Sequence, residues 1–290
     1  MHHARHAPDP DESRSDRGPT HEVRTVGEWL AREPFALALS AGFFGFFAHA
    51  GFVSALESHG LAPDFVTGSS AGALVGGVWA SGTPAARIEE ELRPLRREHF
   101  WDPGVGFGLL RGELFRERVA EMLAAPSFER ARVRAALSAF DVRARRTVVL
   151  DRGDLASAIC ASCAFPGLLQ PVRVGGRAML DGGIADRPGH AGLAPSARRV
   201  LFHHLASRSP WRRRAPEIPR RDGMVTVTLA GLPRLGPFRL ARGAEAFDRA
   251  REATLRALDA PVADVVALEV SGHAGVSDVD RPTRAARTTR

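Results

Sequence analysis

The sequence predicts an α/β protein whose mainly parallel sheet is covered on both faces. Short apolar runs of strand length alternate along the chain with segments whose apolar residues recur at helical spacing. Small residues and glycine follow the first of these runs at once, and no internal repeat interrupts the alternation. Parallel strands need long crossover connections, which are usually helices, so this order of elements indicates a parallel sheet.

The first expected strand is the apolar run PFALALS (Pro34–Ser40), and the helical pattern after it ends on Gly60. A second short strand, DFVTG, leads into SAGALVGGVWASG. This segment is apolar nearly all round, so we expect a buried helix that begins at Ser70. Two charged amphipathic segments follow, ARIEEELRPLRREHF and GELFRERVAEMLAA.

In the second half of the chain, LSAFDV and RTVVLD are expected strands on either side of a short turn. The Ala-rich segment DLASAICASCAF predicts a helix that stops before Pro166, and RAMLDGG predicts a strand that feeds a glycine turn. Three further strands and one amphipathic helix are expected from RRVLFHHLA, GMVTVTLA, ADVVALEV and GAEAFDRAREATLRALD.

These elements belong to one domain, which we place at residues 34–272. Residues 1–33 are polar and are expected to be a disordered N-terminal segment, and residues 273–290 are expected to be an Arg-rich flexible tail. We find no apolar run long enough to span a bilayer and no apolar core of a signal peptide. The expectation is a cytoplasmic protein, with peripheral membrane contact left open.

The charge is strongly basic, with a formal value of +7 and a pI of about 11.0. All 40 basic residues are arginines, and they are scattered among 33 acidic residues instead of forming one block. We therefore expect no nucleic-acid partner. Transient contact between the arginines of residues 211–214 or 281–290 and a membrane surface is an alternative to simple solvation. The two cysteines, Cys160 and Cys163, lack the second pair that a zinc site needs, and no metal or organic cofactor is implied.

The clearest chemical motif is the GxSxG pattern that spans Gly68 to Gly72 in a predicted strand–turn–helix setting. The two flanking glycines allow a sharp turn without side-chain collisions, and they present the central serine, Ser70, above the edge of the sheet. The dipole and free amides of the helix N-terminus favour negative charge that develops there. Ser70 is the predicted nucleophile, and the alternatives are Ser69 or an ordinary turn.

A serine nucleophile also needs an oxyanion site and a base. Gly42, in the connection after the first strand, is the best candidate for a bare backbone amide, with Phe43 beside it. Asp181 ends a predicted strand and is released into a loop by Gly182 and Gly183. The carboxyl ends of parallel strands line one crevice, so Asp181 is expected to reach the serine, and desolvation there would raise its proton affinity.

Together these segments resemble the patatin-like phospholipase family. The resemblance runs from Pro34 to Pro188 and rests on ALALSAGFFGFFAHAGF, GSSAGALVGG and ASCAFPGLLQPVRVGGRAMLDGG, in that order. It implies a three-layer α/β/α sandwich and a Ser-Asp dyad that cleaves acyl esters of lipids. It carries the nucleophile onto Ser70, the base onto Asp181 and the oxyanion loop onto the stretch around Gly42. The implied substrate is a phospholipid or lysophospholipid.

The loop after the first strand departs from the family pattern. The family's glycine-rich GGGxRG-like loop is replaced by AGFFGF, so that Gly45 stands where an arginine is expected. Backbone amides can still serve an oxyanion, whereas a guanidinium that could hold a phosphate is missing. The phenylalanines of this loop, together with residues 101–107, suit either an acyl chain at the entrance or core packing.

Two other functions stay open on sequence grounds. His203 follows Asp181, so Ser70, Asp181 and His203 have the chain order of an α/β-hydrolase triad, which would make the protein a histidine-dependent carboxylesterase. Against this, LFHHLA reads as a strand instead of a loop, and Ser70 lies early for that fold. The altered loop also permits a non-catalytic lipid-binding protein. The oligomeric state is not indicated.

Overall fold

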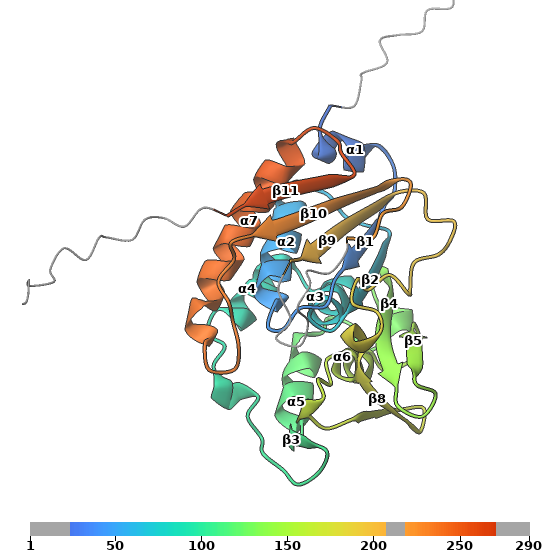
Figure 1. Cartoon of the computed structure of the whole chain (residues 1–290), viewed down its shortest axis with the longest axis vertical. Helices are drawn as coiled ribbons and strands as arrows, with labels where there is room; N and C mark the ends of the chain where they lie inside the picture. Colours follow the sequence, from blue (N-terminus) through green and yellow to red (C-terminus); the bar gives the residue numbers. More distant parts are fainter. Residues whose placement is uncertain (1–23, 207–217, 271–290) are drawn as a thin grey trace, which may run out of the picture.

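The structure is a computed structural model, and it describes residues 24–206 and 218–270 (Figure 1). The arginine-rich stretch at 211–214 and the tail at 273–290 lie outside the described residues. The strands are β1 (Ala36–Leu39), β2 (Phe65–Ser69), β3 (Gly108–Leu110), β4 (Arg134–Asp141), β5 (Arg146–Leu150), β6 (Gly167–Leu169), β7 (Val172–Val174), β8 (Arg177–Asp181), β9 (Val200–Leu205), β10 (Met224–Ala230) and β11 (Val265–Glu269).

A nine-stranded sheet forms the centre of the molecule, in the order β11-β10-β9-β1-β2-β4-β8-β7, with β5 also paired to β4. The strands from β11 to β4 in this order are all parallel, and β5, β8 and β7 add antiparallel pairs at one side. The expected α/β fold with a mainly parallel sheet is confirmed. The β1 strand lies in the middle, so its carboxyl end opens at the centre of the sheet edge.

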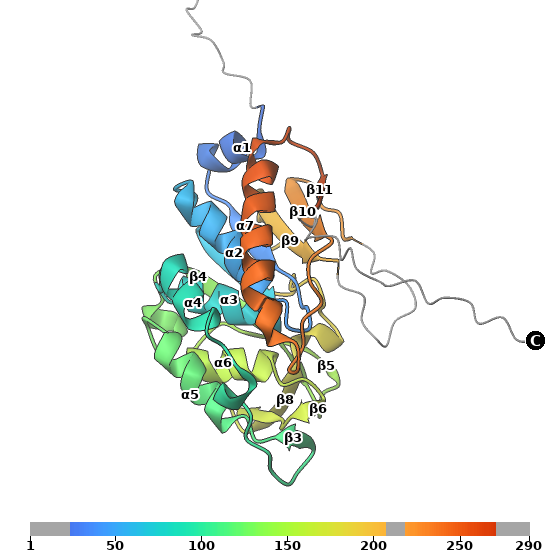
Figure 2. The same ribbon diagram turned by 90° about the vertical axis from the view of Figure 1, so that its left-hand side faces the viewer.

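The helices of the described residues pack against one another and against one face of the sheet (Figures 1 and 2). They are α1 (Val26–Arg32), α2 (Phe46–Ser58), α3 (Ala71–Ala80), α4 (Ala85–Leu92), α5 (Glu113–Met122), α6 (Leu155–Ser162) and α7 (Gly243–Asp259). The alternate residues Leu37 and Leu39 of β1 enter the large core beneath α2 and α7. This core carries most of the buried apolar side chains.

An irregular segment, residues 186–199, covers the opposite face of the sheet. Ala36 and Ala38 of β1 point to this side, where Leu193 and Ala197 pack against the smaller core. The Asp186 carboxylate ties the segment together by accepting the amides of Gly189, His190 and Ala191 and the hydroxyl of Ser138. Both faces are covered as expected, and the cover on this side is irregular chain.

The polar N-terminal segment departs from the expectation of disorder at its end, where α1 forms. Thr25 caps this helix, and its hydroxyl accepts the amide of Glu28 while the Glu28 carboxylate accepts the amide of Thr25. Val26 and Leu30 are buried in the main core. These two apolar residues lie in a mostly polar segment, so the sequence did not indicate that they would be buried. Residues 1–23 lie outside the described part of the chain.

Three short strands, β3, β6 and β7, were not expected from the sequence. Each has three residues, and two of them, β3 and β6, form a separate small sheet. Such short runs carry too little periodicity to be distinguished from loop. In the described ranges, no helix combines the length and the apolar character that crossing a bilayer requires.

Candidate active site

The turn between β2 and α3 holds Ser70 in a backbone conformation that is rare for a residue with a side chain. Its φ and ψ angles are 52° and −118°, at the position directly before the first residue of α3. Strain of this kind persists only where surrounding packing enforces it. The side chain is thereby presented at the amino end of the helix, as the GxSxG motif predicts.

Close packing explains why glycines flank this turn. A Cβ on Gly68 would lie 2.6 Å from the Gly72 carbonyl carbon, and a Cβ on Gly72 would overlap the Leu39 carbonyl oxygen. The two glycines therefore let α3 begin directly against the carboxyl end of β1. Because Leu39 pairs with Gly68 in the parallel β1–β2 register, the loops that follow the two strands start side by side.

Asp181, at the last position of β8, meets Ser70 across 111 positions of sequence. The Ser70 hydroxyl donates to Asp181 Oδ2 at 2.6 Å, and the Gly183 amide donates to Oδ1 at 2.8 Å. Gly182 packs too closely against the Ser138 carbonyl for any side chain, and a Cβ on Gly183 would lie 2.7 Å from the Ala41 side chain. The two glycines thus bring the turn after β8 against the loop after β1.

Burial changes the acidity of this carboxyl group. The Asp181 side chain is almost inaccessible, with 5% of its residue surface exposed. Loss of hydration raises the pKa of Asp181 from 3.8 to about 6, although the hydrogen bonds from Ser70 and Gly183 act in the opposite direction. The carboxylate is therefore ionised near neutral pH, yet it holds a proton more readily than an exposed aspartate does.

Two contacts of Ser70, with a residue on α6 and with the residue just after it, were not predicted from the sequence. The Ser70 amide donates to Ser162 Oγ at 2.9 Å, and the Ser162 hydroxyl in turn donates to the Ser138 carbonyl at 2.6 Å. The Cys163 thiol donates to the Ser70 carbonyl at 3.2 Å. A polar residue on the buried side of an Ala-rich helix was the available signal for Ser162.

The loop after β1 contains the predicted oxyanion residues. The Ala41 amide donates to the Arg187 carbonyl, and the Gly45 amide donates to the Gly42 carbonyl at 2.9 Å. Among the described residues, the amides of Gly42 and Phe43 have no hydrogen-bond partner. Phe44 has a φ of 54°, so the loop makes a tight turn before α2. The loop therefore has two available amides at the edge that Ser70 also occupies.

Aromatic side chains surround this loop. The Phe43 ring, 45% exposed, lies 5.2 Å from the Phe165 ring and 4.9 Å from the Phe44 ring. Phe44 also contacts Phe46 and Phe100 at 5.6 and 6.0 Å between ring centroids. An apolar wall thus borders the position of Ser70 and Asp181.

The structure places the histidines away from Ser70. His203 is fully buried, where it stacks on Phe52 at 4.1 Å and shares a 2.9 Å contact between Nδ1 atoms with His49. Burial lowers the pKa of His49 to about 4 and that of His203 well below its usual range. Within the described residues, no histidine makes a hydrogen bond with the Ser70 hydroxyl. In the described residues, Ser70, Asp181 and His203 therefore do not form a triad.

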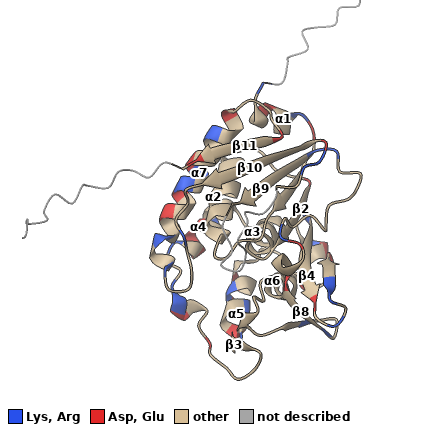
Figure 3. Cartoon of the chain, viewed as in Figure 1, with Lys and Arg blue, Asp and Glu red and all other residues tan. Residues whose placement is uncertain are grey.

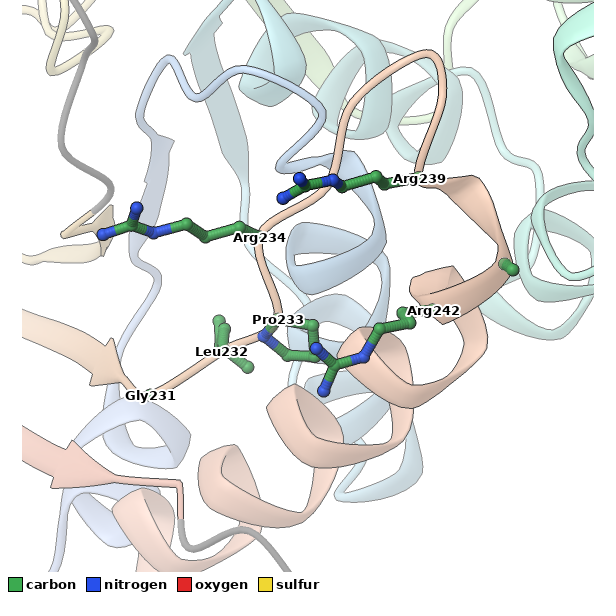
Figure 4. A pocket seen from close by; sticks show the side chains of 7 residues that line it. Gly231, Leu232, Pro233, Arg234, Arg239 and Arg242 are labelled. Carbon is green, nitrogen blue, oxygen red and sulfur yellow. The ribbon is translucent and has the colours of Figure 1, made fainter. Parts of the chain in front are cut away.

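A functional site could also be a metal site or a cavity that holds a ligand. No group of three or more His, Cys, Asp or Glu side chains in the described ranges is arranged to hold a metal ion. A hollow of about 620 Å³ lies after the carboxyl end of β10, lined by Leu232, Pro233 and the arginines at 234, 239 and 242 (Figure 4). Ser70 does not line this hollow. We assign the candidate active site to the Ser70–Asp181 contact, because the predicted nucleophile and the predicted base are hydrogen-bonded there.

Parts of the chain are similar in sequence to known proteins. The chain is 36% identical over 154 residues to an uncharacterized NTE family protein of Mycobacterium tuberculosis (strain ATCC 25618 / H37Rv), covering 52% of this chain and 43% of that protein. It is 26% identical over 184 residues to Lysophospholipase NTE1 of Debaryomyces hansenii, covering 58% of this chain and 12% of that protein. The chain therefore spans less than half the length of these curated relatives.

The fold is also found in a solved structure, VipD from Legionella pneumophila, with a TM-score of 0.54 and 14% identity over 78% of this chain and 67% of that chain. This likeness concerns the fold. The sequence profile described as "Patatin-like phospholipase" matches residues 37–191, which is more than half of the chain and includes both Ser70 and Asp181. The chain belongs to the patatin-like phospholipase family.

Proposed function

We propose that this protein is a serine acyl hydrolase that cleaves carboxylic esters of lipids with Ser70 and Asp181. The observation that carries the proposal is the 2.6 Å hydrogen bond from the Ser70 hydroxyl to Asp181 Oδ2 at the amino end of α3. A nucleophile in hydrogen-bond contact with its base is the geometry that covalent catalysis requires. Family membership supports a lipid as the source of the ester.

In the first half of the reaction, Asp181 accepts the hydroxyl proton while Ser70 Oγ attacks the ester carbonyl carbon. The raised pKa of Asp181, about 6, makes this carboxylate a better proton acceptor than an exposed aspartate. When the tetrahedral intermediate collapses, Asp181 returns the proton to the leaving alcohol. The products of this half are the free alcohol and an acyl ester on Ser70.

The negative charge on the carbonyl oxygen needs donors in the intermediate. We assign this role to the amides of Gly42 and Phe43, which have no partner among the described residues. Backbone donors do not depend on the arginine that Gly45 replaces. The amino end of α3 adds a favourable dipole beside Ser70.

In the second half, water occupies the place of the departed alcohol. The water oxygen attacks the acyl carbon while Asp181 accepts a proton from the water. Asp181 then passes this proton to Ser70 Oγ as the fatty acid leaves. The enzyme is restored with no net change. No step depends on a histidine, which agrees with the position of His203 in the core beside His49 and Phe52.

A phospholipid or lysophospholipid is the proposed substrate class. The name of the D. hansenii relative includes the word lysophospholipase, and the aromatic wall around Phe43 and Phe44 suits an acyl chain. A phosphate cannot be held by a side chain at Gly45, so head-group contacts must come from other residues. Selectivity by head group is therefore expected to be set outside this loop.

The proposal is tested by labelling the purified protein with a fluorophosphonate probe and by measuring fatty acid release from a panel of phospholipids, lysophospholipids and glycerides. We expect labelling and hydrolysis in the wild type and neither in Ser70→Ala. Labelling that persists in Ser70→Ala would identify another nucleophile. Binding of lipid by a protein that neither reacts with the probe nor releases fatty acid would support the non-catalytic alternative.

A further inference from the structure

The hairpin that contains β3 ends in an apolar tip, residues 103–110, with the sequence PGVGFGLL and no charged residue. Val105 is fully exposed and Phe107 is 91% exposed. Figure 3 shows this loop without charged colouring at its far end. Large apolar side chains that project into water in this way are unfavourable unless something covers them.

The hairpin tip is held in place by the rest of the chain. The Gln170 side chain donates to the carbonyls of Val105 and Gly108 at 3.1 and 3.2 Å and accepts the Phe107 amide at 3.3 Å. Asp102, at the base of the hairpin, accepts the first amides of α5. These bonds fix the backbone of the hairpin tip, and in this conformation the side chains of Val105 and Phe107 are exposed.

A second loop places another apolar residue beside the hairpin. Phe238 is 71% exposed, and its ring lies 5.8 Å from the Trp101 ring just before the hairpin. The Arg97 guanidinium lies 5.1 Å from the Phe238 ring and 5.2 Å from the Trp101 ring. This loop, residues 231–242, contains three arginines and no acidic residue, and its arginines line the hollow of Figure 4.

Both loops approach Phe43, in the loop after β1. The hairpin strand β3 pairs with β6, which begins two residues after Phe165, and the Phe165 ring contacts Phe43 of the oxyanion loop. From the other loop, a Cβ on Gly236 would lie 3.8 Å from the Phe43 ring. Figures 1 and 2 show β3 and the start of α7 toward the same end of the molecule. Both loops are therefore linked to Phe43, and their exposed apolar residues lie toward the end of the molecule that holds β3 and the start of α7.

We propose that Val105, Phe107 and Phe238, here called the apolar rim, dock the protein on the surface of an anionic lipid bilayer. This inference rests on the proposed lipid substrate, because docking would deliver that substrate to Ser70. Apolar side chains enter the region between head groups and acyl chains, and nearby arginines attract anionic head groups. Arg242 pairs with Glu245, whereas Arg234 and Arg239 have no ion-pair partner among the described residues, so their charges are available to such a surface.

The test uses the full chain carrying Ser70→Ala, so that vesicles are not degraded, and measures co-sedimentation with vesicles of phosphatidylcholine alone or mixed with phosphatidylglycerol. We expect the Val105→Ser/Phe107→Ser variant to lower the partition coefficient on mixed vesicles by at least about tenfold. We expect Arg234→Gln/Arg239→Gln to lower it by roughly fivefold for each charge removed, and only on vesicles that contain the anionic lipid.

Matched controls lie on other surfaces. Val262→Ser changes an exposed valine before β11, and Arg256→Gln changes an exposed arginine near the end of α7. Both should bind vesicles as the parent does. Equal binding by the rim and control variants would overturn the inference, as would a rim variant that converts a dimer to a monomer in sedimentation while vesicle binding is unchanged.

The outcome is separable from that of the proposed function. With Ser70 present, hydrolysis of a soluble short-chain ester should be the same in the rim variants and in the wild type, because docking is not needed for such a substrate. If the wild type does not hydrolyse the soluble ester, the Ser70–Asp181 proposal is contradicted and the docking proposal is not. Loss of vesicle binding in the rim variants would still support the docking surface.

Discussion

Two buried polar pairs join distant parts of the chain, and they differ in what they can do. Ser70 and Asp181 meet at the ends of elements, with Ser70 partly exposed. His49 and His203 meet inside the core, and both are fully buried. Each pair has a hydrogen bond, at 2.6 Å and 2.9 Å, so contact between polar groups does not by itself mark a reactive site. The two pairs differ in solvent access and in charge: Ser70 is partly exposed and Asp181 can be ionised, whereas both histidines are buried with lowered pKa values.

The hydrogen bonds of the histidine pair indicate which protons are present. His49 Nε2 lies 2.8 Å from the Ser40 carbonyl, which can only accept, so Nε2 of neutral His49 carries a proton. His203 Nδ1 must then donate to His49 Nδ1, and His203 Nε2 has no hydrogen-bond partner among the described residues. Both rings are neutral and fixed in their roles. His203 Nε2 is left as an unpaired acceptor, but it is buried in the core and makes no contact with Ser70.

The two pairs also affect stability with opposite signs as the pH changes. The folded-state pKa of Asp181 is raised, so its contribution to stability is present at low pH and is lost as the pH rises through about 6. The folded-state pKa of His49 is lowered to about 4, so its contribution is present above about 6.5 and is lost as the pH falls toward 4. Opposite responses allow the pairs to be separated by experiment.

Asp181→Asn should give the largest effect. The amide cannot accept the serine proton, so we expect kcat/KM to fall by roughly 10³- to 10⁴-fold. Removing a charge that is costly to bury should also raise the free energy of unfolding at pH 8 by about 2 kcal/mol, with little change at pH 3. Ester hydrolysis and chemical denaturation at both pH values measure these changes.

The matched control for this change is Asp151→Asn, which alters an exposed carboxylate beside Arg152. It should leave both quantities near the wild-type values. An Asp181→Asn protein that keeps its activity would contradict the dyad.

His203→Ala should affect stability more than chemistry. The change leaves a cavity beside Phe52 and removes the hydrogen-bond donor to His49, so we expect the free energy of unfolding to fall by roughly 3 kcal/mol. The kcat/KM of the folded protein should stay within a few-fold of wild type. His59→Ala, at the exposed end of α2, is the control. A folded His203→Ala protein with activity reduced a thousandfold would restore the histidine triad.

The pH dependence of activity gives a smaller, graded test of the same comparison. Below its pKa of about 6, Asp181 is protonated and cannot act as a base. We expect log kcat/KM for a soluble ester to fall by about one for each pH unit below 6 and to level off above it. A profile that is flat from pH 7 to pH 5 would remove Asp181 from this role.

Ser162→Ala should have the smallest effect. It removes the acceptor of the Ser70 amide, which is expected to cost about 1 kcal/mol of stability and to slow fluorophosphonate labelling by less than about tenfold. Ser157→Ala, on the side of α6 that faces Arg116, is the control and should not change the labelling rate. Unchanged labelling of Ser162→Ala would limit the residue to a structural role.

The sequence was sufficient for the parts of the molecule that depend on local patterns. The apolar runs predicted β1, β2, β4, β9, β10 and β11, and these strands form the parallel part of the sheet. The glycines of GSSAG predicted the sharp turn at Ser70, because space and backbone angles there depend on adjacent residues. The catalytic roles of Ser70, Asp181, Gly42 and Phe43 stay predictions.

Long-range partners were harder to predict. The bond from the Ser70 amide to Ser162 joins two segments 92 positions apart, and Gln170 reaches the hairpin tip from 65 positions away. Neither side chain has a local pattern that reveals its target. The irregular cover at residues 186–199 depends on Asp186, whose three bonds to amides are local, whereas its bond with the Ser138 hydroxyl joins positions 48 apart and forms only when the chain has folded back over the sheet.

The loops after β1 and β2 start side by side, and the backbone at this point is held by contacts that do not involve the aromatic side chains of the first loop. Leu39 and Gly68 are fixed opposite each other, and Gly72 locks the helix of the serine to the first strand. The Phe46 side chain packs against the main core, whereas the Phe43 ring is 45% exposed and contacts Phe44 and Phe165. Under the proposed function, exchanging Phe43 or Phe44 would change the space beside Ser70 for a fatty acyl chain and would leave the backbone that positions the Ser70 hydroxyl unchanged.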